Sequence, residues 1–99
     1  MSTPTSAPDE ADDRSAPPLV LVVDDETAIR RFLRANLDAV GYRVDEAIGG
    51  AEALRRAAMQ PPDLVLLDLG LPDMDGLEVV RRLREWLSAP IIVVSARGR

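Results

Sequence analysis

The sequence predicts an α/β protein built on a doubly wound parallel sheet. Two apolar runs, LVLVV at 19–23 and LVLLD at 64–68, are typical of strands that are buried on both faces. Helical patterns alternate with the strands in the order β-α-β-α-β-α-β, which requires parallel strands joined by right-handed crossovers. The 99 residues, 46% of them hydrophobic, suffice for one small domain with its own core.

Composition narrows the function. The formal net charge of −5 disfavours direct binding to nucleic acid, and the absence of cysteine excludes disulfides and thiolate metal sites. The apolar runs are too short to span a membrane, and the N-terminus lacks a signal-peptide pattern. We therefore expect a soluble, cytoplasmic protein without membrane contacts. All 12 basic residues are arginine, so the chain has neither lysine nor histidine.

The first strand is preceded by a polar segment and followed by a predicted helix and a second strand. Residues 1–18 are rich in proline, serine, threonine and acidic residues, and we expect a disordered tail before a globular part at 19–99. A helix is predicted after the first strand, with Gly41 as its C-cap. Its apolar face is predicted to carry Ile29, Phe32, Leu33, Leu37 and Val40. The polar segment 43–47 (RVDEA) is expected to form an edge strand.

Two further helices follow. Gly49-Gly50 is interpreted as a flexible entry to a helix with Ala51, Leu54 and Ala58 on its inner face, which ends at Pro61-Pro62. Asp75 is predicted to be the N-cap of the next helix, with Glu78 completing a capping box. The inner face of that helix is predicted to carry Leu77, Val80, Leu83 and Leu87. Pro90 precedes the last strand, 91–95.

Polar residues stand where three of the strands end. Asp24 and Asp25 follow the first strand, Asp68 follows the third, and Ser95 follows the fourth. The carboxyl ends of neighbouring parallel strands meet at one edge, so these carboxylates are expected to converge. Negative charges at such a short separation are unfavourable unless a cation neutralises them. Mg²⁺ suits such a site because it prefers oxygen ligands and keeps several bound waters. One carboxylate could then attack a phosphoryl group.

Each of these residues also has a simpler interpretation. Asp68 could merely close a turn, Asp25 could cap the first helix, and Ser95 could be an ordinary strand-end hydroxyl.

Other types of functional site fit the spacing of these residues less well. The first strand lacks a G-x-G-x-x-G turn, and a calcium loop would put Leu71 and Arg82 at ligand positions. A phosphatase of the haloacid dehalogenase type needs an acid where this chain has Gly70.

Three motifs together resemble the bacterial response-regulator receiver domain: VVDDE at 22–26, LVLLDLGLPDMDG at 64–76, and PIIVVSA at 90–96. The segments AIRRFLRANL, VVRRLREW and PIIVVSAR are similar, more narrowly, to potassium-operon regulators of the OmpR/PhoB class. The resemblance implies a flavodoxin-like (CheY-like) fold. It also implies the N-terminal part of a transcriptional regulator in a two-component system.

The resemblance further implies a role for individual residues. Asp68 would be the phospho-acceptor for a sensor histidine kinase, and Ser95 would be the switch hydroxyl. The Mg²⁺ ligands would be Asp25 directly, Asp24 mainly through water, Asp68, and Gly70 through its backbone carbonyl. We therefore expect Mg²⁺ as the cofactor and a sensor kinase as the partner.

The match ends near Ala96, where a receiver domain continues. We expect an incomplete sheet of order 2-1-3-4, without the family's fourth helix, fifth strand and fifth helix. The fifth strand would carry the family's phosphate-binding lysine. Three hypotheses stay open: a phosphorylatable receiver, a switch-dead fragment that only binds partners, and a small metal-dependent hydrolase. The last is disfavoured because no general base or substrate pocket is evident, so we expect no enzyme. The fourth strand, left at the edge, is expected to promote self-association.

Overall fold

The computed structural model describes residues 16–94. Within this range the chain alternates strands and helices as the hydrophobic pattern predicts. The elements are β1 (Leu19–Val23), α2 (Thr27–Ala39), β2 (Arg43–Ala47), α3 (Gly50–Met59), β3 (Leu64–Leu67), α4 (Gly76–Arg84) and β4 (Ile91–Val93). Residues 1–15 of the tail expected at 1–18, and the switch residue Ser95, lie outside the described residues.

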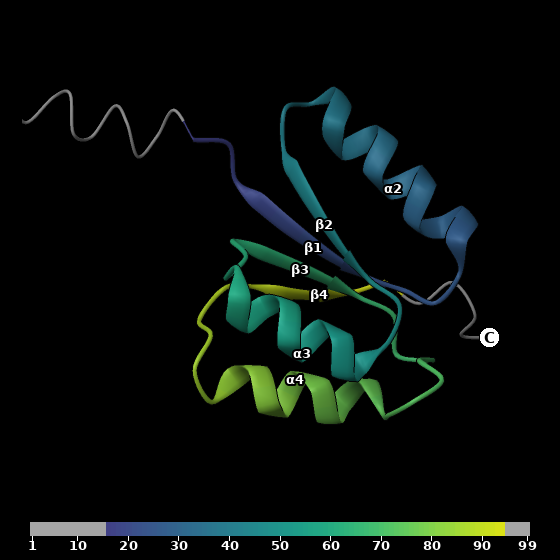
Figure 1. Cartoon of the computed structure of the whole chain (residues 1–99), viewed down its shortest axis with the longest axis vertical. Helices are drawn as coiled ribbons and strands as arrows, with labels where there is room; N and C mark the ends of the chain where they lie inside the picture. The colour runs from purple at the N-terminus through teal and green to yellow at the C-terminus, as the bar shows by residue number, and fades with distance from the viewer. Residues whose placement is uncertain (1–15, 95–99) are drawn as a thin grey trace, which may run out of the picture.

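All four strands pair in parallel in the order β2-β1-β3-β4, which confirms the predicted sheet. Helix α2 covers one face of the sheet, and α3 and α4 cover the other (Figure 1). The chain winds from β1 outward to β2 and then returns to place β3 on the other side of β1. The switch point of this doubly wound sheet therefore lies between β1 and β3, where such folds bind ligands.

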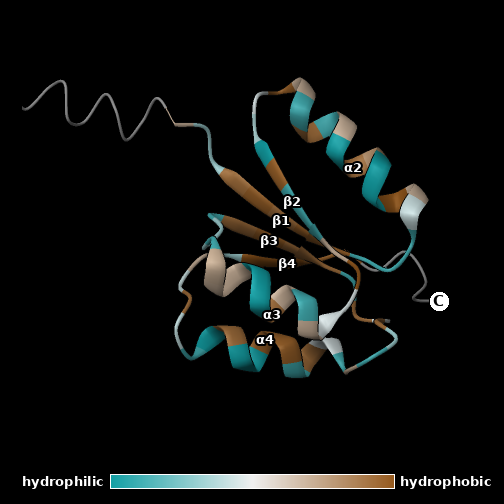
Figure 2. Cartoon of the chain, viewed as in Figure 1, coloured by the Kyte–Doolittle hydropathy of each residue, from teal (hydrophilic) through white to brown (hydrophobic). Residues whose placement is uncertain are grey.

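The two central strands supply most of the core. Every residue of β1 is buried, and both β1 and β3 are strongly apolar along their lengths (Figure 2). Alternate side chains point to opposite faces. Leu21, Val23, Val65 and Leu67 pack toward α3 and α4, whereas Val20, Val22 and Leu66 pack toward α2. This burial on both faces explains why the strands read as continuous apolar runs.

Helix α2 has a narrower inner face than the sequence predicts. Leu33 and Leu37 pack against the sheet, but Phe32 is 65% exposed and Val40 is 68% exposed. Phe32 lies roughly 140° around the helix from Leu37, because each residue turns the helix by about 100°. Val40 is the C-cap and lies beyond the last helical residue. The prediction for these two side chains was therefore wrong.

The predicted inner faces of α3 and α4 are confirmed in part, because Leu54, Val80, Leu83 and Leu87 lie in or against the core. In α3 the buried alanines are Ala53 and Ala57, whereas Ala51 and Ala58 are exposed. Alanines occur all around this helix, so their pattern defines no single face. In α4 the buried residues include Val79 and Leu83, and Leu77 is 59% exposed.

Leu77 lies away from the inner face of α4 because it is about 120° around the helix from the buried Leu83, at about 100° per residue. At the start of the same helix, a Cβ atom at Gly76 would lie 2.7 Å from the Cα atom of Leu69. The first turn of α4 therefore rests directly on the backbone of the segment that follows β3.

The predicted helix ends are confirmed in position, and two caps are corrected. The C-cap of α2 is Val40 rather than Gly41. Gly41 follows it with φ 94° and donates its N–H to Asp38 O, which closes α2 in the left-handed conformation that favours glycine. Asp75 caps α4 by accepting the N–H of Leu77. Glu78 does not complete a capping box, because its carboxylate bonds instead to Arg81 and Arg82. No helix among the described residues is long and apolar enough to cross a membrane.

Candidate functional site

The strand register brings Asp24 and Asp68 to the same edge of the sheet. Val23 of β1 pairs with Leu67 of β3, so the next residue of each strand leaves the sheet at the same level. The backbone N–H of Asp68 donates to Val23 O at 3.0 Å. Parallel pairing between two adjacent buried strands thus dictates that these two carboxylates are neighbours.

Asp24 is buried, with 4% of its surface exposed, and is held on two sides. Its N–H donates to Ala47 O of β2 at 3.0 Å, and its Oδ1 accepts the N–H of Glu26 at 2.8 Å. The second interaction forms a tight turn at the entry to α2. Glu26, not Asp25, is the N-cap residue of that helix. The capping interpretation of Asp25 is therefore wrong.

Asp68 is 2% exposed, and its carboxylate is oriented by its own loop. Oδ1 accepts the N–H of Gly70 at 3.1 Å. The carboxylate therefore has a fixed rotation at the carboxyl end of β3. Gly70 takes part in the site through its N–H, while the metal-binding role of its carbonyl stays a prediction.

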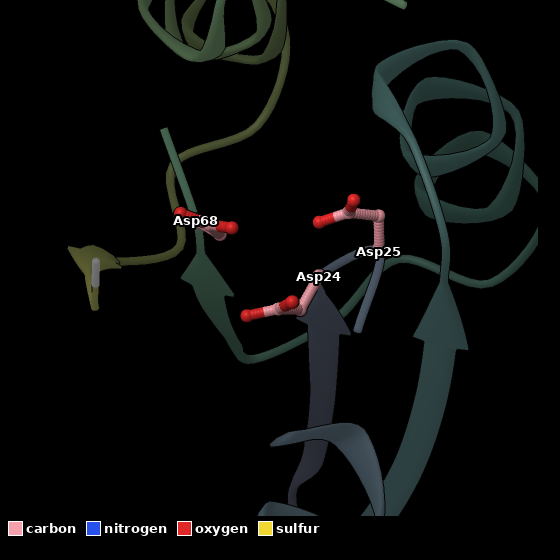
Figure 3. A group of neighbouring side chains, drawn as sticks. All are labelled: Asp24, Asp25 and Asp68. Carbon is pink, nitrogen blue, oxygen red and sulfur yellow. The ribbon is translucent and has the colours of Figure 1, made fainter. Parts of the chain in front are cut away.

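Asp24, Asp25 and Asp68 form a single acidic cluster. One carboxylate oxygen from each residue lies within 4.8 Å of the other two. In Figure 3 the side chains of Asp24 and Asp25 reach from the end of β1 toward Asp68. Asp25 is exposed, whereas its two partners are buried, so the cluster opens to solvent on one side.

Burial and mutual repulsion perturb the cluster. The pKa of Asp24 is raised above its ordinary value, chiefly because burial disfavours the charged form. The hydrogen bond from Glu26 N–H opposes this rise, while the charges of Asp68, Asp25 and Glu26 add to it. The predicted crowding of like charges is therefore confirmed in direction at Asp24.

The residues present fit a hard divalent cation. The donor set consists of carboxylate oxygens that converge at one point, with an open side on which water can complete the coordination. Mg²⁺ prefers oxygen ligands, keeps several waters and binds through few carboxylates. A cation would also relieve the repulsion that raises the pKa of Asp24. The cluster is thus a candidate Mg²⁺ site.

Sequence reasoning missed two residues that support the elements around this cluster. Arg30 of α2 donates from Nη1 to Asp24 O at 2.8 Å and from Nε to Glu46 Oε1 at 2.9 Å. Asp73 accepts two N–H groups at the start of α3. Helical spacing places Arg30 only on a polar face, and Asp73 pairs with residues more than twenty positions away. No local sequence signal could have identified either contact.

The flexible-entry interpretation of Gly49-Gly50 is wrong. Both glycines are buried, and the N–H of Gly50 donates to Asp73 Oδ1 at 2.8 Å. A Cβ atom at Gly50 would lie 2.2 Å from Cγ of Met74. These glycines therefore allow the loop after β3 to approach α3 closely.

Comparison with known proteins identifies relatives for most of the chain. Residues 20–99 match the family described as the response regulator receiver domain. The transcriptional regulatory protein KdpE of Mycobacterium tuberculosis is 62% identical over 79 residues, which cover 80% of this chain and 35% of KdpE. This chain thus spans about a third of the length of that relative.

Solved structures agree with this match. The response regulator TrrA of Thermotoga maritima, in complex with Mg²⁺ and BeF, has a TM-score of 0.77 and 40% sequence identity, over 82% of this chain and 71% of TrrA. TrrA in complex with the histidine kinase ThkA has a TM-score of 0.76 and 40% identity, over 83% of this chain and 72% of the matched chain.

Asp24→Asn is expected to stabilise the protein at neutral pH when no divalent cation is present. Because the pKa of Asp24 is raised in the folded state, the folded protein binds this proton more tightly than the unfolded chain. The resulting stability is fully present below the ordinary pKa of 3.8 and is lost as the pH rises through the raised value. Asparagine avoids this loss and keeps an oxygen to accept the N–H of Glu26.

Urea unfolding in EDTA, from about pH 3 to about pH 7, measures this effect as the free energy of unfolding. The wild-type curve should fall more steeply with pH just above 3.8 than the Asp24→Asn curve. Parallel curves, or a variant less stable at neutral pH, would contradict the electrostatic account of the cluster.

Proposed function

The chain belongs to the response-regulator receiver family, and from this premise we propose that it accepts a phosphoryl group on Asp68 from a sensor histidine kinase. Its role is then that of a phospho-acceptor module in two-component signalling. The observation that carries the proposal is the buried Asp68 carboxylate, which lies at the switch point of the sheet within 4.8 Å of two further carboxylates.

The environment of Asp68 supports its role as the nucleophile. Gly70 N–H holds Oδ1, and this fixes the plane of the carboxylate. An oxygen of Asp68 would form the new bond to phosphorus as the bond from phosphorus to the kinase's histidine nitrogen breaks, and that nitrogen would retain the electron pair.

Asp24, Asp25 and Asp68 would hold Mg²⁺ beside the reacting oxygen, together with the Gly70 carbonyl. Bound Mg²⁺ offsets negative charge on the oxygens of the transferring phosphoryl group. Asp24 has one oxygen engaged by Glu26 N–H and is buried, which favours contact through water. Asp25 is exposed and suits direct coordination. The TrrA complex with Mg²⁺ and BeF supports the same chemistry in a relative.

A sensor histidine kinase is the proposed phosphodonor. The relative TrrA has been solved together with the histidine kinase ThkA, which supports this class of partner. The 62% identity to KdpE supports a place in the regulation of potassium-transport operons. The output of the whole regulator would require segments comparable to the remaining two thirds of that relative.

An alternative function is that of a switch-dead receiver module. A switch-dead module would bind Mg²⁺ and partner proteins without accumulating phosphate. The next experiment separates the two functions.

Incubation with acetyl phosphate and Mg²⁺ is expected to label Asp68 and no other residue. Borohydride trapping followed by mass spectrometry of peptides locates the acyl phosphate. Asp68→Asn should remove the label entirely, whereas Asp75→Asn, which alters an exposed acid in the same loop, should leave it. Labelling of another aspartate would contradict the proposal. No label on a protein that still binds Mg²⁺ would favour the switch-dead alternative.

Asp25→Ala is expected to weaken Mg²⁺ binding more than Asp24→Ala. Removing a residue that acts through water typically lowers metal affinity by about 10-fold to 100-fold. Removing a direct ligand also breaks a bond to the metal and should therefore cost more. Calorimetric titration of both variants with MgCl₂ measures the difference. Equal dissociation constants would show that the two carboxylates do not have these distinct roles.

The expected self-association through β4 also has structural support. Among the described residues β4 pairs with β3 only, and Ile92 and Val93 are 48% and 44% exposed. Val94 donates its N–H to Leu67 O, so the N–H of the preceding Val93 points away from β3. We propose that this edge pairs with β4 of a second copy, as open apolar edges readily do.

Val93→Pro is expected to abolish this association because proline removes the outward N–H. Val93→Thr is the matched control, since it keeps both the β-branched shape and the N–H. Sedimentation velocity over a range of concentrations should show dimers for the wild type and Val93→Thr, and monomers for Val93→Pro. A wild type that stays monomeric throughout would exclude the β4 interface.

A further inference from the structure

The start of α3 is capped by an acidic residue from a distant segment. Asp73, in the loop between β3 and α4, accepts the N–H of Gly50 through Oδ1 at 2.8 Å and the N–H of Ala51 through Oδ2 at 3.0 Å. Its carboxylate spans both donors, and the pKa of Asp73 is lowered chiefly by the hydrogen bonds from Ala51 and Gly50. Asp73 therefore remains charged in this contact.

Helix α3 requires such a partner from elsewhere in the chain. The first N–H groups of a helix have no acceptor within it, and the N-cap residue of α3 is Gly49, which has no side chain to serve. The positive end of the helix dipole also favours a carboxylate at this position. Asp73 supplies both the acceptor oxygens and the charge.

The surrounding packing is built for this contact. A Cβ atom at Gly49 would lie 2.8 Å from Asp73 Oδ1, and one at Gly50 would lie 2.2 Å from Cγ of Met74. A side chain at Gly49 would displace the carboxylate of Asp73, and one at Gly50 would displace the side chain of Met74. The two glycines and Asp73 therefore form one contact between the loop 69–75 and the start of α3.

The same loop carries the groups that orient Asp68. Its first turn is fixed by the hydrogen bond from Gly70 N–H to Asp68 Oδ1, and its last residues are fixed by Asp75 at the start of α4. Asp73 lies between these points and ties the middle of the loop to α3. Helix α3 follows β2, whose Ala47 O accepts the N–H of Asp24. The contact between Asp73 and α3 thus links the loop that follows Asp68 to β2, the strand that supports Asp24.

We propose that Asp73 is a positioning residue for the acidic cluster. By anchoring the loop 69–75 to α3, it holds Gly70 against Asp68 and keeps the cluster in the geometry that binds Mg²⁺. The inference rests on the proposed function, because it assigns Asp73 a role in the same metal site. Asp73 would act through the loop and not as a metal ligand.

A purely structural role makes a different prediction. If Asp73 only caps α3, its loss lowers the free energy of unfolding and leaves the Mg²⁺ affinity of the folded protein unchanged. A second confounding effect is the loss of one negative charge near a cation site. Asp75→Ala controls for both, because it removes an N-cap and a charge from the same loop without touching α3.

Calorimetric titration of the 99-residue protein with MgCl₂, at a temperature where circular dichroism shows each variant folded, tests the proposal. Asp73→Ala is expected to weaken Mg²⁺ binding by about tenfold, the effect of losing an outer support of a metal site. Asp73→Asn keeps one acceptor oxygen and should recover much of that affinity. Asp75→Ala should lose much less than Asp73→Ala.

Amide hydrogen exchange at Gly70 gives a second readout. It should accelerate in Asp73→Ala and, to a smaller degree, in Asp73→Asn, which also serves if the alanine variant does not fold. Equal Mg²⁺ affinities for Asp73→Ala and Asp75→Ala would overturn the positioning role. Gly70 exchange that stays at the wild-type rate in Asp73→Asn would also overturn it. A wild type that fails to bind Mg²⁺ would overturn the proposed function and this inference with it.

Discussion

The convergence of three carboxylates at one edge of the sheet is the constraint on which the rest of this structure depends. Asp24 and Asp68 are buried there because β1 and β3 are adjacent central strands that end at the same level. Like charges in a buried setting repel and lose hydration, which costs folding free energy. The surrounding structure must therefore hold these groups in place, and it does so largely with backbone N–H donors.

Those donors come from short turns directly after each strand. Asp24 accepts the N–H of Glu26, and Asp68 accepts the N–H of Gly70. Hydrogen bonds to a carboxylate favour its charged form, so the turns oppose part of the cost of burial. A bound cation would offset the unfavourable burial and repulsion that raise the pKa of Asp24. Metal binding at such a site would stabilise the folded state.

Charged side chains around the cluster connect the helices, strands and loops that carry it. Arg30 connects α2 to Asp24 O and to Glu46 of β2, and Arg34 also binds Glu46. These ion pairs hold the pKa of Glu46 below its usual value, with Arg34 as the largest cause. Asp73 performs the comparable task between α3 and the loop after β3. Polar contacts thus stabilise the carboxyl edge of the sheet on both faces, and this is the edge at which doubly wound folds bind their ligands.

The sequence by itself determined the strands, their order and the acidic cluster. Continuous apolar runs, a strand-ending Asp24 and Asp68, and helix-end residues such as Gly41 and Asp75 are local signals, and each reflects a local physical preference. Tertiary structure decided which faces of the helices are buried and which distant groups meet. Phe32 and Leu77 are exposed because each lies too far around its helix from the residues that contact the sheet. Asp73 reaches α3 because folding, rather than sequence proximity, brings a carboxylate to N–H groups that the helix itself cannot satisfy.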